Sequence, residues 1–474
     1  MMKKKILLCI GLLAAIVSTQ AKDYDVMKYG ATGKGKSLDT KSIQEAIDIC
    51  ADNGGGRVIL PKGTYLCGTF YLRDNVDLYL EHGAVIKGST DVTNKDIYPR
   101  RALVAAIKVK GARILGPGTI DGQSDTPEFN NQGLTNSDGK RPYLVLFDGC
   151  SDVTVKEVHL VNSAFWTLRF VKCDGVLVDG ITVNSTHFYN NDGIDIDAKN
   201  VRIANCLIDA LDDGICLKSN STDFMPENIV VTNCVISSNC NPIKFGTASM
   251  AGFRNVAISN CVIKRPPESF HWDWSDSTKF YRGIAPGTKT GLGGISIECV
   301  DGGLVEHIVV NNITMEGIIT PIFLCVNSRH GIGTMRDIHI SNITAVCEGI
   351  LPCMITGIKD SRITDVTLRD ITVQHAGGEK PMTGRLRENE KAYPENRMYG
   401  LFNPACGLFV RHADNILVEN FRITNRKTDR RPAVVLDDVT DFRGYEMRCT
   451  GSVSPLFLQY FDCKDISLDS EKIL

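Results

Sequence analysis

The chain has 474 residues, a length that permits either one long all-β domain or two to three smaller domains. It carries 53 Lys and Arg against 55 Asp and Glu, which gives a formal net charge of −2. This balance excludes a chain-wide affinity for nucleic acid or for an anionic membrane surface, and it favours a neutral or mildly anionic partner.

The first 21 residues have the pattern of a cleavable export signal. Three lysines at 3–5 precede an apolar stretch at 6–17, and Ala21 ends a segment typical of a signal-peptide cleavage site. The apolar stretch is too short to span a bilayer, and no later stretch reaches that length. We therefore expect residues 1–21 to be removed and residues 22–474 to form a single domain. We expect that domain to reach the periplasm or the cell exterior without a membrane span.

An internal repeat dominates the rest of the sequence. Each copy has apolar residues at alternate positions and a polar break near its middle, as in Val201–Ile208 and Ile229–Ile236. Most copies lie roughly 23 to 30 residues apart. The other copies are at 153–160, 176–183, 256–263, 308–315, 338–345, 366–373 and 416–423.

One such unit buries too little apolar surface to be stable alone, so the copies must stack. Parallel stacking of short strands gives a continuous hydrophobic core. The copies lack the leucine ladder and the helical half of leucine-rich repeats. Residues 39–50, apolar at Ile43 and Ile47, predict an amphipathic helix over the open N-terminal end. The predicted fold is all-β, a right-handed parallel β-helix with an N-terminal capping helix.

The chain contains 17 cysteines. Cys206, Cys234 and Cys261 each follow an asparagine at one-repeat spacing, which predicts a column of small buried side chains rather than disulfides. No His/Cys cluster has the spacing of a zinc site. Three cysteines lie outside the rhythm, and their pairing stays open: Cys406, Cys449 and Cys463.

Three consecutive coils contain related acidic or polar segments. Aligning their isoleucines places Asp192, Asp213 and Asn241 in one column, with Asp212 one step earlier. Stacked carboxylates repel one another and shift one another's pKa values, a cost that indicates a functional site. An inverting glycosidase needs one carboxyl group to donate a proton and an opposing carboxylate to activate water. Asp212 set against Asp192 and Asp213 supplies both.

Two alternative roles for these acids stay open. Aspartates before glycine are common in turns. Four of the acids could also form a calcium cage, namely Asp192, Asp195, Asp197 and Asp213.

Longer motifs resemble a known family. Tyr29–Gly35, Gly54–Tyr65, Asn190–Asp195 and the Asp212-Asp213-Gly214 triplet are similar to glycoside hydrolase family 28, the polygalacturonases, and the resemblance covers nearly the whole mature chain. It implies that Asp212 is the general acid, that Asp192 and Asp213 hold the attacking water, and that Asn190 lies at the substrate. It also implies hydrolysis of pectic polysaccharide or oligosaccharide with inversion, without a metal or another cofactor.

Two motifs of that family are replaced. Cys240-Asn241-Pro242 stands where Gly-His-Gly is expected, so Asn241 takes the place of the histidine. Ser296-Ile297-Glu298 stands where Arg-Ile-Lys binds the substrate carboxylate, and Glu298 would repel a uronate. Lys244 has the same register as Ser296 and is predicted to supply a cation instead. If Lys244 is only structural, a neutral sugar such as rhamnose becomes as plausible as galacturonate.

Two insertions, 264–293 and 377–400, interrupt the repeat, and they are predicted to wall one end of the groove and to favour exo action. Trp272 and Trp274 in the first insertion are predicted to stack on sugar, or else to pack the loop on the solenoid. Arg329 is predicted to meet an acidic substrate or to pair with a neighbouring acid.

The leading hypothesis is therefore an exported, monomeric glycoside hydrolase that acts on pectic glycan. A second hypothesis is a calcium-dependent polysaccharide lyase with Lys244 or Arg329 as the base. A third is a carbohydrate-binding β-helix that has lost catalysis, although such a binder has little reason to stack acids.

Overall fold

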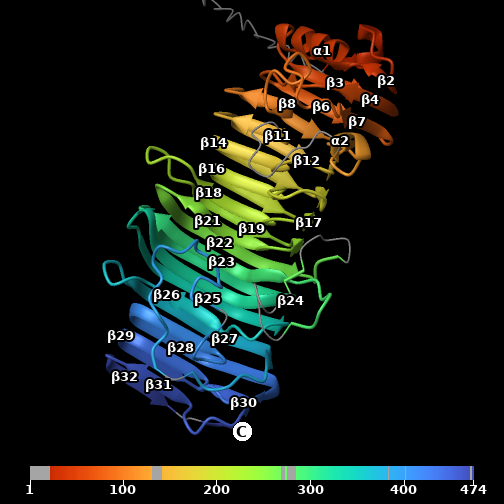
Figure 1. Cartoon of the computed structure of the whole chain (residues 1–474). Helices are drawn as coiled ribbons and strands as arrows, with labels where there is room; N and C mark the ends of the chain where they lie inside the picture. Colours follow the sequence, from red (N-terminus) through yellow and green to blue (C-terminus); the bar gives the residue numbers. More distant parts are fainter. Residues whose placement is uncertain are drawn as a thin grey trace, which may run out of the picture.

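The computed structural model describes residues 22–130, 141–267, 273–274, 284–382, 384–400, 402–469 and 472–473. They form one long stack of coils, as Figure 1 shows, in which the strands pair in parallel from coil to coil. The predicted right-handed parallel β-helix is confirmed. Residues 1–21, predicted to be the export signal, lie outside the described part of the chain.

The N-terminal coils are closed by a helix. Helix α1 (Thr40–Asp52) buries Ile43, Ala46, Ile47 and Cys50 completely against the first coils, which confirms the predicted cap. The elements of this part are β1 (Asp23–Asp25), η1 (Val26–Tyr29), β2 (Lys34–Leu38), β3 (Gly56–Leu60), β4 (Gly63–Cys67), β5 (Phe70–Tyr71), β6 (Val76–Leu80), β7 (Ala84–Gly88), β8 (Ala102–Ile107), β9 (Arg113–Leu115), β10 (Thr119–Asp121), α2 (Pro127–Asn130), β11 (Tyr143–Asp148), β12 (Ser151–Lys156) and β13 (His159–Val161).

The middle coils carry the acidic segments on their paired strands. Ile194, Ile215, Ile243 and Ile295 pair in sequence across four coils, so the alignment made from the isoleucines is confirmed. The strands of this part are β14 (Leu168–Asp179), β15 (Thr182–Ser185), β16 (Ile194–Ala204), β17 (Leu207–Ala210), β18 (Ile215–Ser219), β19 (Glu227–Thr232), β20 (Val235–Ser238), β21 (Ile243–Ser249), β22 (Gly252–Ile263), β23 (Gly291–Asp301) and β24 (Leu304–Gly331).

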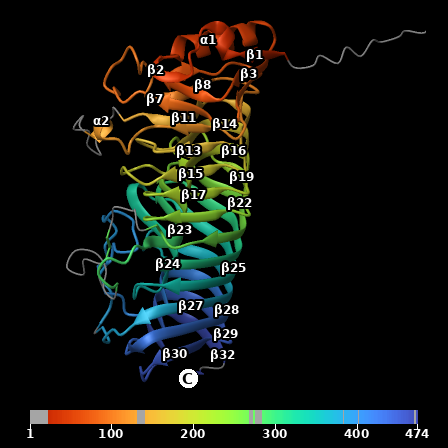
Figure 2. The same ribbon diagram turned by 90° about the vertical axis from the view of Figure 1, so that its right-hand side faces the viewer.

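The C-terminal coils continue the same stack. Their strands are β25 (Thr334–Cys347), β26 (Cys353–Thr356), β27 (Ile363–Gly377), β28 (Leu408–Asp429), β29 (Val434–Tyr445), β30 (Arg448–Ser452), β31 (Leu458–Phe461), β32 (Lys464–Asp469) and β33 (Lys472–Ile473). In Figure 2 the segment between β27 and β28 leaves the stack and projects from one side of the solenoid. Among the described residues, no helix is long and apolar enough to cross a membrane.

Asparagines make the bends within each coil. Asn200, Asn228 and Asn255 adopt φ values of 54°, 59° and 60°, in the left-handed region that asparagine tolerates better than most residues. Their side chains also stack, because Asn228 Nδ2 donates to Asn200 Oδ1 at 3.0 Å and Asn255 Nδ2 to Asn228 Oδ1 at 2.7 Å. The turn just before each of these three repeat copies is therefore bonded to the equivalent turn of a neighbouring coil.

Cysteines fill the core as free thiols. Cys206, Cys234 and Cys261 are at most 2% exposed and lie in adjacent coils, which confirms the predicted buried column. The described chain holds sixteen free cysteines, fifteen of them buried. Cys406 Sγ lies 4.0 Å from Cys449 Sγ, and Cys463 is only partly buried.

Candidate active site

The acidic column forms where three coils enter their paired strands. Gly193 N donates to the carbonyl of Asp213 at 2.9 Å, and Gly214 N donates to the carbonyl of Asn241 at 2.9 Å. These ladder bonds stack Asp192, Asp213 and Asn241 directly on one another. The side chains continue the column, because Asn241 Nδ2 donates to Asp213 Oδ1 at 2.9 Å.

A small cavity of about 250 Å³ opens over this column. It brings together acids, two lysines, an arginine and two aromatic rings from coils far apart in sequence. Its lining residues are Trp166, Asn190, Asp192, Asp212, Asp213, Lys218, Asn220, Lys244, Thr247, Ala248, Arg329 and Tyr393.

Asp212 is held in place by the backbone and by Asn190. Its Oδ2 accepts from Asn190 N at 3.2 Å and from Asn190 Nδ2 at 3.4 Å, while its Oδ1 accepts from Asp213 N at 3.0 Å. Asn190 is itself fixed by Arg141, whose Nη2 donates to Asn190 Oδ1 at 3.0 Å. Burial, together with the charges of Asp192 and Asp213, raises the pKa of Asp212 to about 8. Asp212 is therefore mostly protonated at neutral pH, as a general acid must be.

Lys218 lies among the other acids of the cavity. Its Nζ is 3.1 Å from Asp192 Oδ2, 3.5 Å from Asp195 Oδ1 and 3.9 Å from Asp213 Oδ2. Burial lowers the pKa of Lys218, but Cys216 and the three aspartates outweigh it and raise that pKa well above its ordinary value. Sequence reasoning missed Lys218, although alternation after the buried Ile215 and Leu217 puts it on the outer face.

Lys244 bridges the acidic column and the replaced family motif. Its Nζ lies 3.5 Å from Asp213 Oδ2 and 3.7 Å from Glu298 Oε1, and the side chain is only 6% exposed. The predicted register of Lys244 with Ser296 is confirmed by their strand pairing. Burial raises the pKa of Glu298 to about 7, against the opposing effect of Lys244.

Glu298 and Asn241 have positions that differ from the predicted contact with sugar. Glu298 is 1% exposed, and its carboxylate faces Lys244. Asn241 uses its amide on Asp213 and on Ser296, whose Oγ donates to Asn241 Oδ1 at 2.9 Å. Neither side chain is among those that line the cavity, because both lie beneath it and hold the groups that do. Their assignment as substrate-binding residues is therefore corrected to a supporting position.

One group of described residues has metal-ligand spacing. Ligand atoms of Asp192, Asp195 and Cys216 lie within 4.8 Å of one another. A calcium ion needs six to eight oxygen ligands. Cys216 offers sulfur instead, and the Lys218 ammonium already lies beside both aspartates. The donor set does not fit calcium, and the lysine supplies the positive charge that the acids require.

Comparisons with known proteins relate this chain to glycoside hydrolases. The family model of glycosyl hydrolases family 28 matches residues 50–265, a span that contains the whole acidic column and Lys244. The chain is 24% identical over 406 residues to a probable polygalacturonase from Vitis vinifera, covering 77% of each chain. It is 23% identical over 384 residues to an exopolygalacturonase from Zea mays, covering 75% of this chain and 84% of the relative.

The chain is polygalacturonase-like, and its residues 50–265 match glycoside hydrolase family 28. A solved structure, the hyperthermoactive exopolygalacturonase from Thermotoga maritima, superposes with a TM-score of 0.63 and 19% identity, over 84% of this chain and 92% of that one. At that identity the likeness supports the fold alone. The family match ends before Ser296–Glu298, where the chain departs from the expected substrate motif.

Trp274 of the first insertion packs on the solenoid, which is the second of its two predicted roles. The Trp274 indole is 7% exposed and packs with Cys240, Ile284 and Leu292, while its Nε1 donates to the carbonyl of Asn239 at 2.7 Å. An indole buried in this way anchors the loop on the solenoid, so its stacking role is corrected. Trp272 lies outside the described residues.

Arg329 pairs with a neighbouring acid, and its contact with an acidic substrate stays a prediction. It lines the cavity, and its guanidinium also pairs with Asp301 through Nε at 2.8 Å and Nη2 at 2.5 Å. Asp301 is also 2.9 Å from His330 Nδ1. The pairing fixes the direction of the Arg329 side chain beside the cavity.

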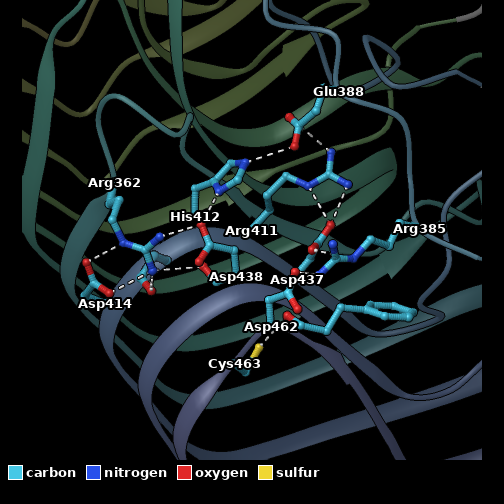
Figure 3. Close-up of polar contacts among 12 residues, drawn as sticks. Arg362, Arg385, Glu388, Arg411, His412, Asp414, Asp437, Asp438, Asp462 and Cys463 are labelled. Carbon is cyan, nitrogen blue, oxygen red and sulfur yellow. Dashed lines mark hydrogen bonds and ion pairs between the residues drawn. The ribbon is translucent and has the colours of Figure 1, made fainter.

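The insertion 377–400 brings Tyr393 to the cavity, where its hydroxyl lies 3.2 Å from Thr247 Oγ1. Figure 3 shows how this insertion is fastened to the C-terminal coils through Glu388. Glu388 Oε1 is 3.1 Å from His412 Nε2, and His412 Nδ1 is 2.7 Å from Asp438 Oδ2. Tyr393 could not be found from the repeat, because it lies 146 positions beyond Thr247 in the sequence.

Proposed function

We propose that this family 28 protein is an exported glycoside hydrolase that cleaves pectic polysaccharide or oligosaccharide with inversion. The proposal rests on one observation. In the cavity, Asp212, whose pKa is raised to about 8, lies beside Asp192 and Asp213, which are paired with Lys218. Two carboxyl groups with different protonation states are what inverting hydrolysis requires.

Each side chain then has a defined step. Asp212 gives its proton to the glycosidic oxygen as the bond from that oxygen to the anomeric carbon breaks. A water held by Asp192 and Asp213 attacks the anomeric carbon from the opposite face and gives its proton to one of these carboxylates. Lys218 forms ion pairs with Asp192 and Asp213 and offsets the repulsion between these two carboxylates.

The substrate that fits best carries carboxylates. Lys244 and Arg329 line the cavity, and their cationic heads favour an anionic sugar over a neutral one. The relatives at 24% and 23% identity bear the names polygalacturonase and exopolygalacturonase. We therefore assign galacturonate as the sugar, ahead of rhamnose.

The insertion supports exo action on short chains. Tyr393 reaches the cavity from the insertion 377–400 and narrows the groove on the side of the later coils. A groove closed at one end accepts a chain terminus. We further propose that residues 1–21 direct export and that the mature protein acts as a monomer.

Product analysis tests the function. Purified protein is incubated with galacturonate oligosaccharides, with and without a chelator, in water enriched in heavy oxygen. We expect products heavier by one water, labelled at the new reducing end, and no effect of the chelator. Unsaturated products that vanish with the chelator would assign the protein to the lyases instead.

The variant Asp212→Asn tests the acid. It should lower kcat by about 10²- to 10⁴-fold, since the amide cannot donate the proton in the same way. The matched control is Asp223→Asn, which removes an exposed carboxylate paired with Lys172 and should keep wild-type activity. Full activity of the Asp212→Asn protein would refute the assignment.

A further inference from the structure

A cluster of arginines and aromatic rings lies on the N-terminal side of the acidic column. It consists of Arg101, Tyr143, Phe165, Trp166 and Arg169, and we call it the arginine–aromatic cluster. Arg101 precedes β8, Tyr143 begins β11, and Arg169 lies in β14, so three successive coils contribute to it. The mechanism proposed above uses none of these five residues.

The two guanidinium groups stack on the rings. Arg169 Cζ lies 4.0 Å from the centroid of the Trp166 ring, and Arg101 Cζ lies 4.0 Å from that of Phe165. Both arginines also lie over Tyr143, at 5.5 and 5.2 Å. A stacked guanidinium keeps its N–H donors in its own plane, where they can bind a carboxylate edge-on. The rings therefore orient the arginines without consuming their donors.

Arg169 has an unused donor in a buried place. Arg169 is 9% exposed, and its Nη1 has no hydrogen-bond partner among the described residues. A buried charged donor without a protein partner costs free energy, and an anionic ligand would offset that cost.

The neighbouring coil supplies charge but no hydrogen bond to Arg169. Asp195 pairs with Arg169 across the strands and interacts with its charge, but Lys218 Nζ lies 3.5 Å from the same carboxylate. Neither oxygen of Asp195 accepts a hydrogen bond from the described residues. The Nη1 donor of Arg169 therefore stays available to a carboxylate from outside the chain.

The arginine–aromatic cluster adjoins the catalytic cavity. Trp166 lines that cavity, and Lys218 Nζ lies 5.0 Å from the centroid of the same ring. The next residue, Thr167, donates its backbone N–H to the carbonyl of Asp192 at 2.8 Å. A sugar chain that lies over Asp192 therefore passes Trp166 before it reaches Arg169.

We propose that Arg169 and Arg101 form a carboxylate-binding subsite for a second uronate residue of the substrate, on the side of the cavity opposite Lys244 and Arg329. This inference rests on the proposed function, since it assigns a chain of acidic sugars to the same groove. Two cationic subsites that flank the acids bind an acidic oligosaccharide at both sides of the cleaved bond. The N-terminal subsite offers the carboxylate recognition that the replaced Arg-Ile-Lys motif does not.

Binding without turnover tests the subsite directly. In the Asp212→Asn background, calorimetry measures the Kd of a galacturonate trisaccharide and of its fully methyl-esterified form. Adding Arg169→Gln should weaken binding of the acid by about tenfold or more, because a charge-assisted hydrogen bond is lost. Binding of the methyl ester should change less than about twofold, since no carboxylate meets the guanidinium.

A neighbouring arginine provides the matched control. Arg100 pairs with Asp148 at 2.8 Å on the surface, and Arg100→Gln should alter neither Kd. Equal weakening of acid and ester by Arg169→Gln, or no weakening of either, would overturn the subsite. If Arg169→Gln fails to fold, as judged by circular dichroism, Arg101→Gln carries the same comparison with the same two outcomes.

Turnover by the wild-type protein separates this inference from the proposed function. If the wild-type protein hydrolyses the trisaccharide while Arg169→Gln leaves acid binding unchanged, the subsite alone is wrong. If nothing is hydrolysed yet acid binding depends on Arg169, the proposed reaction is wrong and the subsite stands.

Discussion

Two lysines hold the acids of the cavity together. Lys218 contacts Asp192, Asp195 and Asp213, and Lys244 contacts Asp213 and Glu298. The carboxyl groups outnumber the lysines, so the cluster retains protons that isolated carboxylates would lose at neutral pH. At the scale of single residues, the chemistry of the site depends on Asp212, the carboxyl group that keeps its proton at neutral pH.

The raised pKa of Asp212 sets the pH dependence of activity and stability. Activity should fall as the pH rises through about 8, because the proton to be donated is lost. The folded state binds this proton more tightly than the unfolded state, whose Asp pKa is about 3.9. The stabilising contribution is thus complete below about pH 4 and is lost as the pH rises to about 8.

Urea unfolding at several pH values checks this linkage. Relative to Asp212→Asn, the wild-type protein should lose roughly 1 kcal/mol of stability per pH unit between about pH 4 and 8. Parallel curves for the two proteins over that range would contradict the raised pKa.

Lys244 should be needed for stability as well as for binding. Lys244→Met leaves Asp213 and Glu298 without their shared cation and should destabilise the fold by about 3 kcal/mol, measured by urea unfolding. The double variant Lys244→Met/Glu298→Gln should recover part of this loss, because one of the two stranded charges is removed. If the double variant is no more stable than Lys244→Met, Glu298 is not charged in the folded protein.

At the scale of elements, the insertion 377–400 connects the C-terminal strand β28 with the cavity beside β21. Its Glu388 is fastened to His412 and Arg411 in β28, while its Tyr393 lies at the cavity beside Thr247 of β21. Other bonds hold its middle, such as Asn327 Nδ2 to the carbonyl of Ala392 at 3.1 Å. The position of Tyr393 therefore depends on contacts made several coils away.

Releasing this anchor should affect the substrate site at a distance. Glu388→Gln weakens the charged contacts to His412 and Arg411 and should raise the KM for oligosaccharide by about threefold, with kcat little changed. Limited proteolysis should also cut within 377–400 sooner. Glu390→Gln makes the same charge change in the same insertion, away from these two contacts, and should do neither. An unchanged KM in Glu388→Gln would show that Tyr393 is positioned without this anchor.

The whole molecule is a stack in which each coil is stabilised by its neighbours. The buried isoleucines and valines of successive coils form a continuous core, and free cysteines fill narrow places in it. Since burial keeps these thiols from reagents, their accessibility reports the integrity of the entire stack.

Thiol labelling measures that integrity. In the native protein, iodoacetamide should modify Cys463 among the described cysteines, because it alone of that set is partly exposed. In urea the other fifteen should react together if the coils unfold as one cooperative unit. Stepwise labelling that advances from one end would indicate coils that unfold separately.

The sequence alone determined the coils and the acidic column. A period of one coil and the alternation of buried and exposed positions specify which residues stack in a parallel sheet. For this reason Asp192, Asp213 and Asn241, and likewise Lys244 and Ser296, were placed correctly from residue patterns. The resemblance to family 28 added roles to residues whose column was already evident.

Only the tertiary structure decided which side chains touch. Lys218 among the aspartates, Glu388 on His412, and Arg169 over Trp166 depend on the direction of each side chain and on the path of insertions between coils. The same holds for Trp274, whose indole packs in a small apolar cluster that anchors its loop on the solenoid. The repeat specifies which residues are neighbours along the stack. Long side chains and long loops reach past those neighbours, and the repeat period does not determine which residues they contact.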